Sequence, residues 1–404
     1  MSEQQPLKEY RPIFNRSYLK YLGFVVAIAI IFLSEKSPQP LAQPQLIAQA
    51  KSGLQQLQID GLEQQRLLLS FSSSPALTGS EQKQRQLIYQ ALRKSVADSQ
   101  YVNAVLWTFD RLEIELHWPP EQDISIADTL QQLVDNSYRY DTAATEKLIA
   151  AQYYLQSKQP QQLLLNSFNQ SMASHYYAQG NLRQLLTRRP TALLFTAESD
   201  QSQLGAIIDR QLAALFPLPG PEFPKPVSWQ AKQRILNART GQNSFLSAVQ
   251  LETLSNGQNQ VELLSNFVLS RYLQERPDYR GLNFRLIHQP IYDGGYRLLI
   301  ISSATKIAAP LLQQISSEIA VLSPAQIEDH LTQVKDQLLQ QYQSLLEDPE
   351  RLIKLYSKKH FYRLNTLSRS EYSAHLDTID AEQISAQIRK LFGDNTISIR
   401  LQQR

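Results

Sequence analysis

The segment VNAVLWTFDRLEIELHW, residues 102–118, decides the fold of this chain. Apolar and polar side chains alternate from Leu112 to Trp118, and a period of two is typical of a half-buried strand. The part before it, 102–110, is rich in aliphatic and aromatic residues and also favours a strand. The segment therefore predicts two neighbouring strands that pair with each other.

The elements around this strand pair occur twice along the chain. In the first half we predict strand 66–73, helix 80–96, the strand pair, helices 124–136 and 142–157, further helical sequence to about 186, strand 191–196 and helix 201–216. In the second half we predict strand 245–251, helix 260–276, strands 283–289 and 297–302, helices 311–322 and 324–346, a later helix, and strand 396–401. This duplication predicts an α+β fold of two related α/β domains, each a mostly antiparallel sheet with helices on one face.

Local signals fix several of these boundaries. Asp293-Gly294-Gly295 is typical of a tight hairpin turn. Ser323, Pro324 and Gln326 have the spacing of a helix N-cap with its capping box, and Asp380 with Gln383 repeats that spacing before the last helix.

Prolines separate the two halves. Five of them, at 217, 219, 221, 224 and 226, remove backbone donors from a short stretch and exclude both a helix and a central strand. We therefore expect a first domain over 59–216, a linker over 217–228 and a second domain over 229–404.

Composition limits the chemistry that the chain can perform. It has 404 residues, a net charge of +3, no cysteine and six histidines. Without cysteine there is no disulfide, no thiolate metal site and no cysteine nucleophile. The net charge is too small to indicate nucleic-acid binding. The first histidine in the chain is His117, so metal ligands are scarce in the first domain.

The N-terminal region predicts attachment to a membrane. The uncharged stretch YLGFVVAIAIIFL, 21–33, follows a basic segment, 1–20. Such a run fits a short anchor at 21–34 or a signal peptide. The A-x-A at Ala48–Ala50 lies too far from the run to favour cleavage. We therefore expect one span in a bacterial inner membrane, a Pro/Gln-rich tether over 35–58, and the bulk of the chain in the periplasm.

Three segments resemble the M16 metallopeptidases, the insulinase or pitrilysin type with an inverted zinc motif. They are VNAVLWTFDRLEIELHW with the helices that follow it, SRYLQERPDYRGLNF at 270–284, and IDAEQISAQIRKLFGDNTISIRL at 379–401. The resemblance implies the duplicated α+β architecture that the element order predicts. It also implies where a zinc site and a substrate-binding site would lie.

The residues that this family uses to hold zinc are missing. The family places H-x-x-E-H on the first helix and a further glutamate on a later one. Here the matching helix, 80–96, has no histidine. On the later helix Glu146 matches the first family acid, but Tyr153 stands where the metal-binding glutamate belongs. The resemblance therefore implies that neither zinc nor the general base is present.

The second half departs from the family independently. The family's substrate-binding arginine falls at Pro277 and its tyrosine at Phe284, and neither residue can supply the required group. Arg280, Gly281 and Leu282 match the family segment. Two separate parts of one active site are thus lost while the segment that carries them is kept.

Other patterns have ordinary explanations. His117 and Glu121 could form a pair of metal ligands, but a histidine at the end of a strand is the simpler interpretation. The run Lys358-Lys359-His360 suits the C-terminal end of a helix. The stretch 147–197 has no acidic residue and could face an acidic partner or lipid headgroups, although a solvated face is the simpler interpretation. No phosphate loop and no nucleophilic serine motif occurs.

We therefore expect a membrane-anchored, periplasm-facing M16-like pseudopeptidase that uses no cofactor. The resemblance implies an active M16-type subunit as its partner. One alternative is a stand-alone periplasmic scaffold that binds extended peptides. A third possibility is a zinc protease with a relocated site.

Overall fold

The computed structural model describes residues 45–49, 53–59, 62–173, 182–196, 202–217, 229–238, 244–251, 255–291, 294–303 and 309–403. The expected anchor, most of the tether and nearly all of the Pro-rich linker lie outside these ranges. Within them, no helix has both the length and the apolar character needed to cross a membrane.

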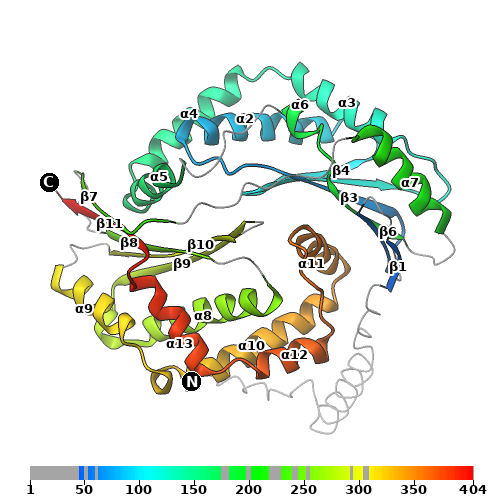
Figure 1. Cartoon of the computed structure of the whole chain (residues 1–404). Helices are drawn as coiled ribbons and strands as arrows, with labels where there is room; N and C mark the ends of the chain where they lie inside the picture. Colours follow the sequence, from blue (N-terminus) through cyan, green and yellow to red (C-terminus); the bar gives the residue numbers. More distant parts are fainter. Residues whose placement is uncertain are drawn as a thin grey trace, which may run out of the picture. The chain divides into compact units, whose positions relative to one another are not determined.

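The first sheet has six strands in the order β1-β2-β6-β3-β5-β4 (Figure 1). They are β1 Gln45–Gln49, β2 Leu54–Gln58, β3 Gln65–Ser72, β4 Val102–Trp107, β5 Arg111–Trp118 and β6 Thr191–Thr196. Only β2 and β6 run parallel, and the other neighbours are antiparallel. The expected strand pair is thus β4 and β5, and the sheet is mixed but mostly antiparallel.

The second sheet has five strands in the order β7-β11-β8-β10-β9. They are β7 Lys232–Ala238, β8 Ser244–Gln250, β9 Leu282–Ile291, β10 Gly294–Ser303 and β11 Thr396–Gln403. Again one pair, β11 with β7, is parallel. The hairpin between β9 and β10 uses Gly294 and Gly295 at φ 141° and 130°, and a side chain at Gly295 would collide with the carbonyl of Gln289. Asp293 lies outside the described residues.

Helices follow the strands in the predicted order, but some elements were not predicted and one predicted helix is divided. The first half has α2 Gly79–Val96, α3 Ile126–Arg139, α4 Ala143–Ser157, α5 Pro160–Met172, α6 Leu182–Leu185 and α7 Ser202–Leu215. The second has α8 Asn256–Glu275, α9 Ala309–Ala320, α10 Glu328–Leu346, α11 Pro349–Phe361, α12 Arg369–Asp377 and α13 Ala381–Arg389. Strands β1 and β2 lie within 35–58, where we expected a tether; for α11 only the C-terminal end was expected, and β7 and α12 were not predicted.

The predicted helix at 324–346 is divided. Its expected capping box at Ser323 and Gln326 is present, but it opens only a short 3-10 turn, Pro324–Gln326. The regular helix α10 begins only at Glu328. The capping box at Asp380 and Gln383 opens α13 as predicted.

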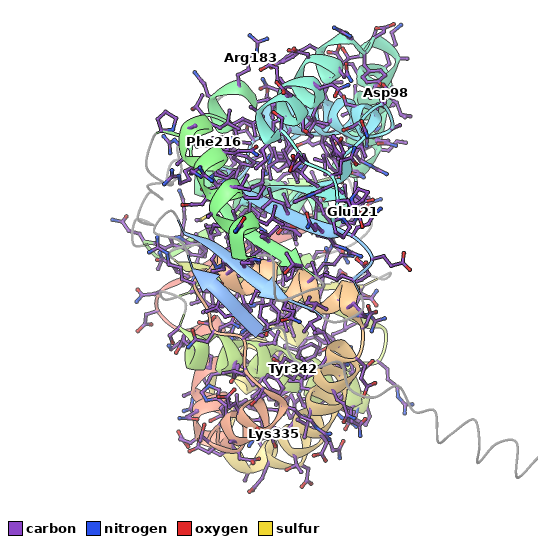
Figure 2. The ribbon with its side chains drawn as sticks, turned by 90° about the vertical axis from the view of Figure 1, so that its right-hand side faces the viewer. Asp98, Glu121, Arg183, Phe216, Lys335 and Tyr342 are labelled. Atoms are coloured by element: carbon purple, nitrogen blue, oxygen red, sulfur yellow. The ribbon has the colours of Figure 1, made fainter. Side chains whose placement is uncertain are left out.

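Each sheet packs one face against the helices of its own half. Leu69, Leu112 and Ile114 of the first sheet face α2, α3 and α7. In the second sheet, Leu299 and Ile301 belong to one core cluster with residues of α8, α9, α10, α12 and α13, and Figure 1 shows these helices on one side of that sheet. Phe216, labelled in Figure 2, closes the first of these cores edge-on to Phe71, with ring centres 5.5 Å apart.

The prediction that helices cover only one face of each sheet is wrong. The second face of the five-stranded sheet packs against α5, which precedes it in the first half, through Leu164, Phe168 and Met172. The second face of the six-stranded sheet packs against α11, from the second half, through Ile353. One helix of each half thus packs against the sheet of the other half. Central strands such as β10, buried along their whole length, need this cover on both faces.

A buried polar contact joins α11 to the turn between β4 and β5. The hydroxyl of Tyr362, the residue after α11, donates to the Asp110 carboxylate at 2.9 Å. Beside it, the Arg111 guanidinium lies 2.6 Å from Glu113 and stacks near the rings of Phe361 and Tyr362. Burial raises the pKa of Asp110 to about 6, and the charge of Arg111 only partly opposes this.

The raised pKa of Asp110 predicts that stability falls as the pH rises. The folded-state pKa of about 6 exceeds the ordinary value of 3.8. The contribution of protonated Asp110 to the free energy of unfolding is therefore fully present below pH 3.8 and is lost as the pH rises through 6. The loss is about 1–3 kcal/mol. Asp110→Asn keeps an acceptor for Tyr362 and cannot ionise, so urea unfolding from pH 4 to pH 8 should show a flatter profile and a more stable variant at pH 8. The exposed Asp123→Asn is the control, and an identical profile for wild type and Asp110→Asn would contradict the assignment.

Candidate functional site

The first helix of the M16-like arrangement, α2, begins with its acidic residue already engaged. The Thr78 hydroxyl accepts from the Glu81 N–H at 3.2 Å, while the Glu81 carboxylate accepts from the N–H groups of Leu77 and Thr78 at 3.1 and 2.9 Å. Glu81 is the only acid on α2. The carboxylate therefore holds the helix start and is not available as a general base.

Arg85, one turn further along α2, points into the protein. Its guanidinium donates to the carbonyls of Phe109 at 2.9 Å and Thr108 at 3.2 Å, to the carbonyl of Ser74, and to the Ser73 hydroxyl at 3.2 Å. It also lies 5.3 Å from the centre of the Trp107 ring. Burial lowers the pKa of Arg85 to about 10, which still leaves it charged at neutral pH. A fixed cation therefore ties α2 to the end of β4.

A hollow of about 370 Å³ opens between α2, the end of β4 and α5. Its walls carry side-chain amides, aromatic rings and one guanidinium, but no carboxylate and no imidazole. The lining residues are Ala76, Gln82, Arg85, Gln86, Tyr89, Trp107, Thr108, Phe109 and Asn169. Such walls can hydrogen-bond to peptide groups and shield apolar side chains, but they offer no group to activate water.

Tyr153 lies where α4 meets α2. Its hydroxyl packs over Gly79, where a side chain would collide with it, and the ammonium of Lys83 lies 4.8 Å from its ring centre. Partial burial raises the pKa of Tyr153, so its phenol stays neutral. The position that the resemblance assigns to a metal-binding carboxylate thus holds a neutral ring beside a lysine. Glu146, the retained acid, is exposed in the first turn of α4.

These residues do not fit a zinc ion. In the parts of the chain that the structure describes, no three His, Cys, Asp or Glu side chains gather closely enough to hold a metal. The charged groups next to these positions are cations, the inward-pointing Arg85 and the exposed Lys83 beside Tyr153, and both would repel a divalent metal. Structural and catalytic zinc both require at least three anionic or imidazole ligands.

The two second-half positions that align with the family's substrate-binding arginine and tyrosine lie in different environments, one at the surface and one against the core. Pro277 is exposed and opens a 3-10 turn, Pro277–Tyr279. Phe284 packs into the core of the second half, 6.0 Å from the ring of Tyr279. Neither residue offers a polar group to a substrate.

The retained residues between them have structural roles. Arg280 is exposed. Gly281 has φ 88°, a value that favours glycine, and its carbonyl accepts from the Ser303 hydroxyl at 3.2 Å. Leu282 packs against the core at the start of β9. Within the matching triplet, Gly281 and Leu282 thus shape the turn into β9.

A cluster that the sequence did not indicate surrounds Glu318 on α9. The hydroxyls of Tyr272 and Tyr279 both donate to its carboxylate, and Arg276 lies 3.2 Å from it. Burial and the neighbouring carboxylate raise the pKa of Tyr272 to about 12. Sequence reasoning missed this cluster and Arg85 because their partners are distant in the chain.

The other sequence candidates are also accounted for by local contacts. His117 pairs with Glu115 on the same strand at 2.6 Å, and Glu121 is exposed at the surface of the first half (Figure 2). Lys358, Lys359 and His360 form the last turn of α11, where the helix dipole favours positive charge.

Comparison with known proteins finds similarity in structure only. No family model matches the sequence, and no curated protein matches it. The structure is similar to a peptidase M16 inactive domain from Pseudomonas fluorescens (TM-score 0.63, 14% identity, covering 89% of this chain and 98% of that one). It is also similar to a protease from Helicobacter pylori (0.59, 12%, 90% and 100%) and to the periplasmic protease PqqL of Escherichia coli (0.55, 12%, 91% and 48%).

These similarities agree with what the residues indicate. The likeness extends over about nine-tenths of the chain, and one of the similar structures is itself described as inactive. At such low identity the likeness shows the fold and not an activity. The chain therefore has the fold of M16 peptidase domains, without a zinc-binding group among its described residues.

Proposed function

We propose that this protein is a catalytically inactive M16-like pseudopeptidase that binds an active M16-type peptidase subunit at the periplasmic side of the inner membrane. The observation that carries the proposal is the inner side of α2. Arg85 points inward there, with a capping carboxylate and no histidine on the helix, and the exposed Lys83 lies beside Tyr153, while the surrounding fold is kept. A domain can retain its packing and its binding surfaces after losing its catalytic groups, because fold and site are separable.

Membrane attachment through 21–34 and a role as a partner subunit are parts of this proposal. The resemblance to a family that often works in active and inactive pairs supports the partner role, and the apolar run after a basic segment supports the anchor. The protein would complete a substrate chamber or hold the active subunit at the membrane.

Metal analysis provides the first check. The full chain, incubated with excess zinc and then dialysed, should retain far less than one zinc per molecule and should cleave no peptide. Lys83 and Arg85 disfavour the metal, and no ligand set exists among the described residues. Stoichiometric zinc together with cleavage by the isolated chain would refute the pseudopeptidase and support a relocated site.

Co-isolation tests the partner. The tagged full chain, gently solubilised from its native membrane, should recover a second protein that carries H-x-x-E-H, in a fixed ratio. Recovery of the tagged chain without such a protein would refute the partner role.

A second candidate, a stand-alone peptide-binding module, is favoured by one observation. The hollow beside α2 adjoins β4, which is an edge strand of its sheet, and such an edge can accept an extended peptide as an added strand. Two results together would favour this candidate. The isolated chain would bind extended peptides, less tightly after Trp107→Ala, and the membrane extract would yield no H-x-x-E-H partner.

A further inference from the structure

One helix of the first half shows an apolar face that the described residues leave uncovered. The helix α4, Ala143–Ser157, lies beside α2 and α5 (Figure 1) and has a single buried side chain, Ile149. Away from Ile149, Leu148 and Leu155 are 58% and 65% exposed. Surface helices normally place such residues toward the core.

The exposed residues form a regular stripe. Ala144, Leu148, Ala151 and Leu155 are all exposed and follow one another at intervals of four, three and four residues. This is the spacing of the seam along which two helices pack in a coiled coil. The stripe therefore fits another helix.

Alternation of small and large residues favours a helix over a lipid surface. Ala144 and Ala151 would add little to membrane partitioning, since burial energy scales with apolar area. In a helix pair, however, alanine allows close approach and receives the leucine of the facing helix. A lipid-binding helix would in addition need more cations beside the stripe than Lys147 and Lys158.

We propose that the stripe on α4 binds the same stripe of a second copy of this chain, with the two helices antiparallel. In this register Ala144 faces Leu155 of the other copy, and Leu148 faces Ala151. Every apolar layer then contains one leucine and one alanine, and the arrangement is symmetric about a two-fold axis. A parallel pair would place leucine against leucine and alanine against alanine.

Charged and aromatic residues support the same orientation. In the antiparallel register Asp141, just before α4, meets Lys158 at the end of the other helix. Lys147 approaches Tyr154, a residue that is 60% exposed. A parallel pair would instead bring Lys158 against Lys158, since the chain has no acid between 147 and 197. Antiparallel helix dipoles also attract each other.

The absence of native cysteine makes cross-linking a clean test. Full-length chains in mild detergent that carry Ala144→Cys and, separately, Leu155→Cys should form a disulfide when mixed under mild oxidation. Neither variant should cross-link with itself, because like positions lie about 16 Å apart along the axis. A disulfide requires Cα atoms within roughly 7 Å.

Two results of this experiment would overturn the proposal. One is self-linking of Ala144→Cys that equals linking in the mixture. The other is linking no greater than that between Ala143→Cys and Gln156→Cys, which are exposed at similar heights on α4 but off the stripe.

Sedimentation of the same full chain gives an independent measurement. Leu148→Glu should weaken the dimer at least about tenfold, because each copy loses a buried leucine at the interface. Ala150→Glu, exposed but off the stripe, should leave the dimer unchanged. Asp141→Lys and Lys158→Asp should each weaken it, and the double variant should recover it.

A monomer at all accessible concentrations would refute the second copy. In that case a protein lost from the preparation on Leu148→Glu would identify another occupant of the stripe.

Discussion

Replacement of Arg297 by alanine is expected to lower the free energy of unfolding by about 3–5 kcal/mol, among the largest effects available in this chain. Arg297 on β10 is fully buried. Its guanidinium donates to the Ser265 hydroxyl and to the carbonyl of Gln387. Burial lowers its pKa to about 10, while the nearby charge of Glu262 opposes that shift.

The cost arises from what the arginine leaves behind. Glu262 is also fully buried, and its carboxylate accepts from Gln258 at 3.0 Å and lies 3.1 Å from the imidazole of His288. Without Arg297 this negative charge loses its nearby compensating cation, and the carbonyl of Gln387 loses a donor. A buried charge or polar group without a partner is far costlier than an apolar replacement of both.

Urea unfolding of the full chain measures the effect. Arg285→Ala, at an exposed position on the neighbouring strand β9, is the matched control and should change stability by less than about 0.5 kcal/mol. The double variant Glu262→Gln with Arg297→Met should recover much of the loss. A single Arg297→Ala variant as stable as the control would show that the network contributes nothing.

Truncation of Phe168 to alanine is expected to cost about 3–5 kcal/mol. Phe168 on α5 is fully buried and packs edge-on to Tyr296 at 4.9 Å and to Trp229 at 5.7 Å. The helix comes from the first half, whereas both partners belong to the second. The variant should therefore weaken the attachment of α5 to the second sheet as well as leave a cavity.

The shape of the unfolding curve carries the second part of this prediction. In the wild type the exchanged helices α5 and α11 should make both halves unfold in one transition. Phe168→Ala, in a background with Trp107→Phe and Trp118→Phe, should lower the midpoint for fluorescence of Trp229 at least as much as for far-ultraviolet circular dichroism. Gln170→Ala, exposed on the same helix, should change neither. Wild-type halves that unfold in separate transitions would contradict the coupling through exchanged helices.

The sequence predicted elements whose signals are local. The strand pair β4 and β5, the hairpin at Gly294 and Gly295, and the capping boxes at Ser323 and Asp380 all lie within a few residues of the groups that define them. Strands β2 and β7 were missed because their glutamine, lysine and arginine residues mask the apolar pattern. As strands at or near a sheet edge, they depend on their neighbours for pairing.

For the candidate site, the sequence established what is missing and the structure showed what replaces it. The sequence alone shows that the first helix has no histidine and that Tyr153 replaces a glutamate. That Arg85 bonds to carbonyls of Ser74, Thr108 and Phe109 cannot be seen there, because these groups meet only when α2 packs against β4. The same holds for Glu318, whose two tyrosines and arginine come from another helix and the turn that follows it.

The sequence by itself thus determined the duplicated α+β order and the loss of zinc ligands, since periodicity, caps and residue types are properties of short segments. Tertiary structure alone decided that α5 and α11 cover the sheet of the opposite half, that Arg297 and Glu262 share a buried network, and that the described residues leave one face of α4 uncovered. These outcomes depend on which apolar surfaces meet and on where buried charges find partners. Both are set by contacts between residues far apart in the chain.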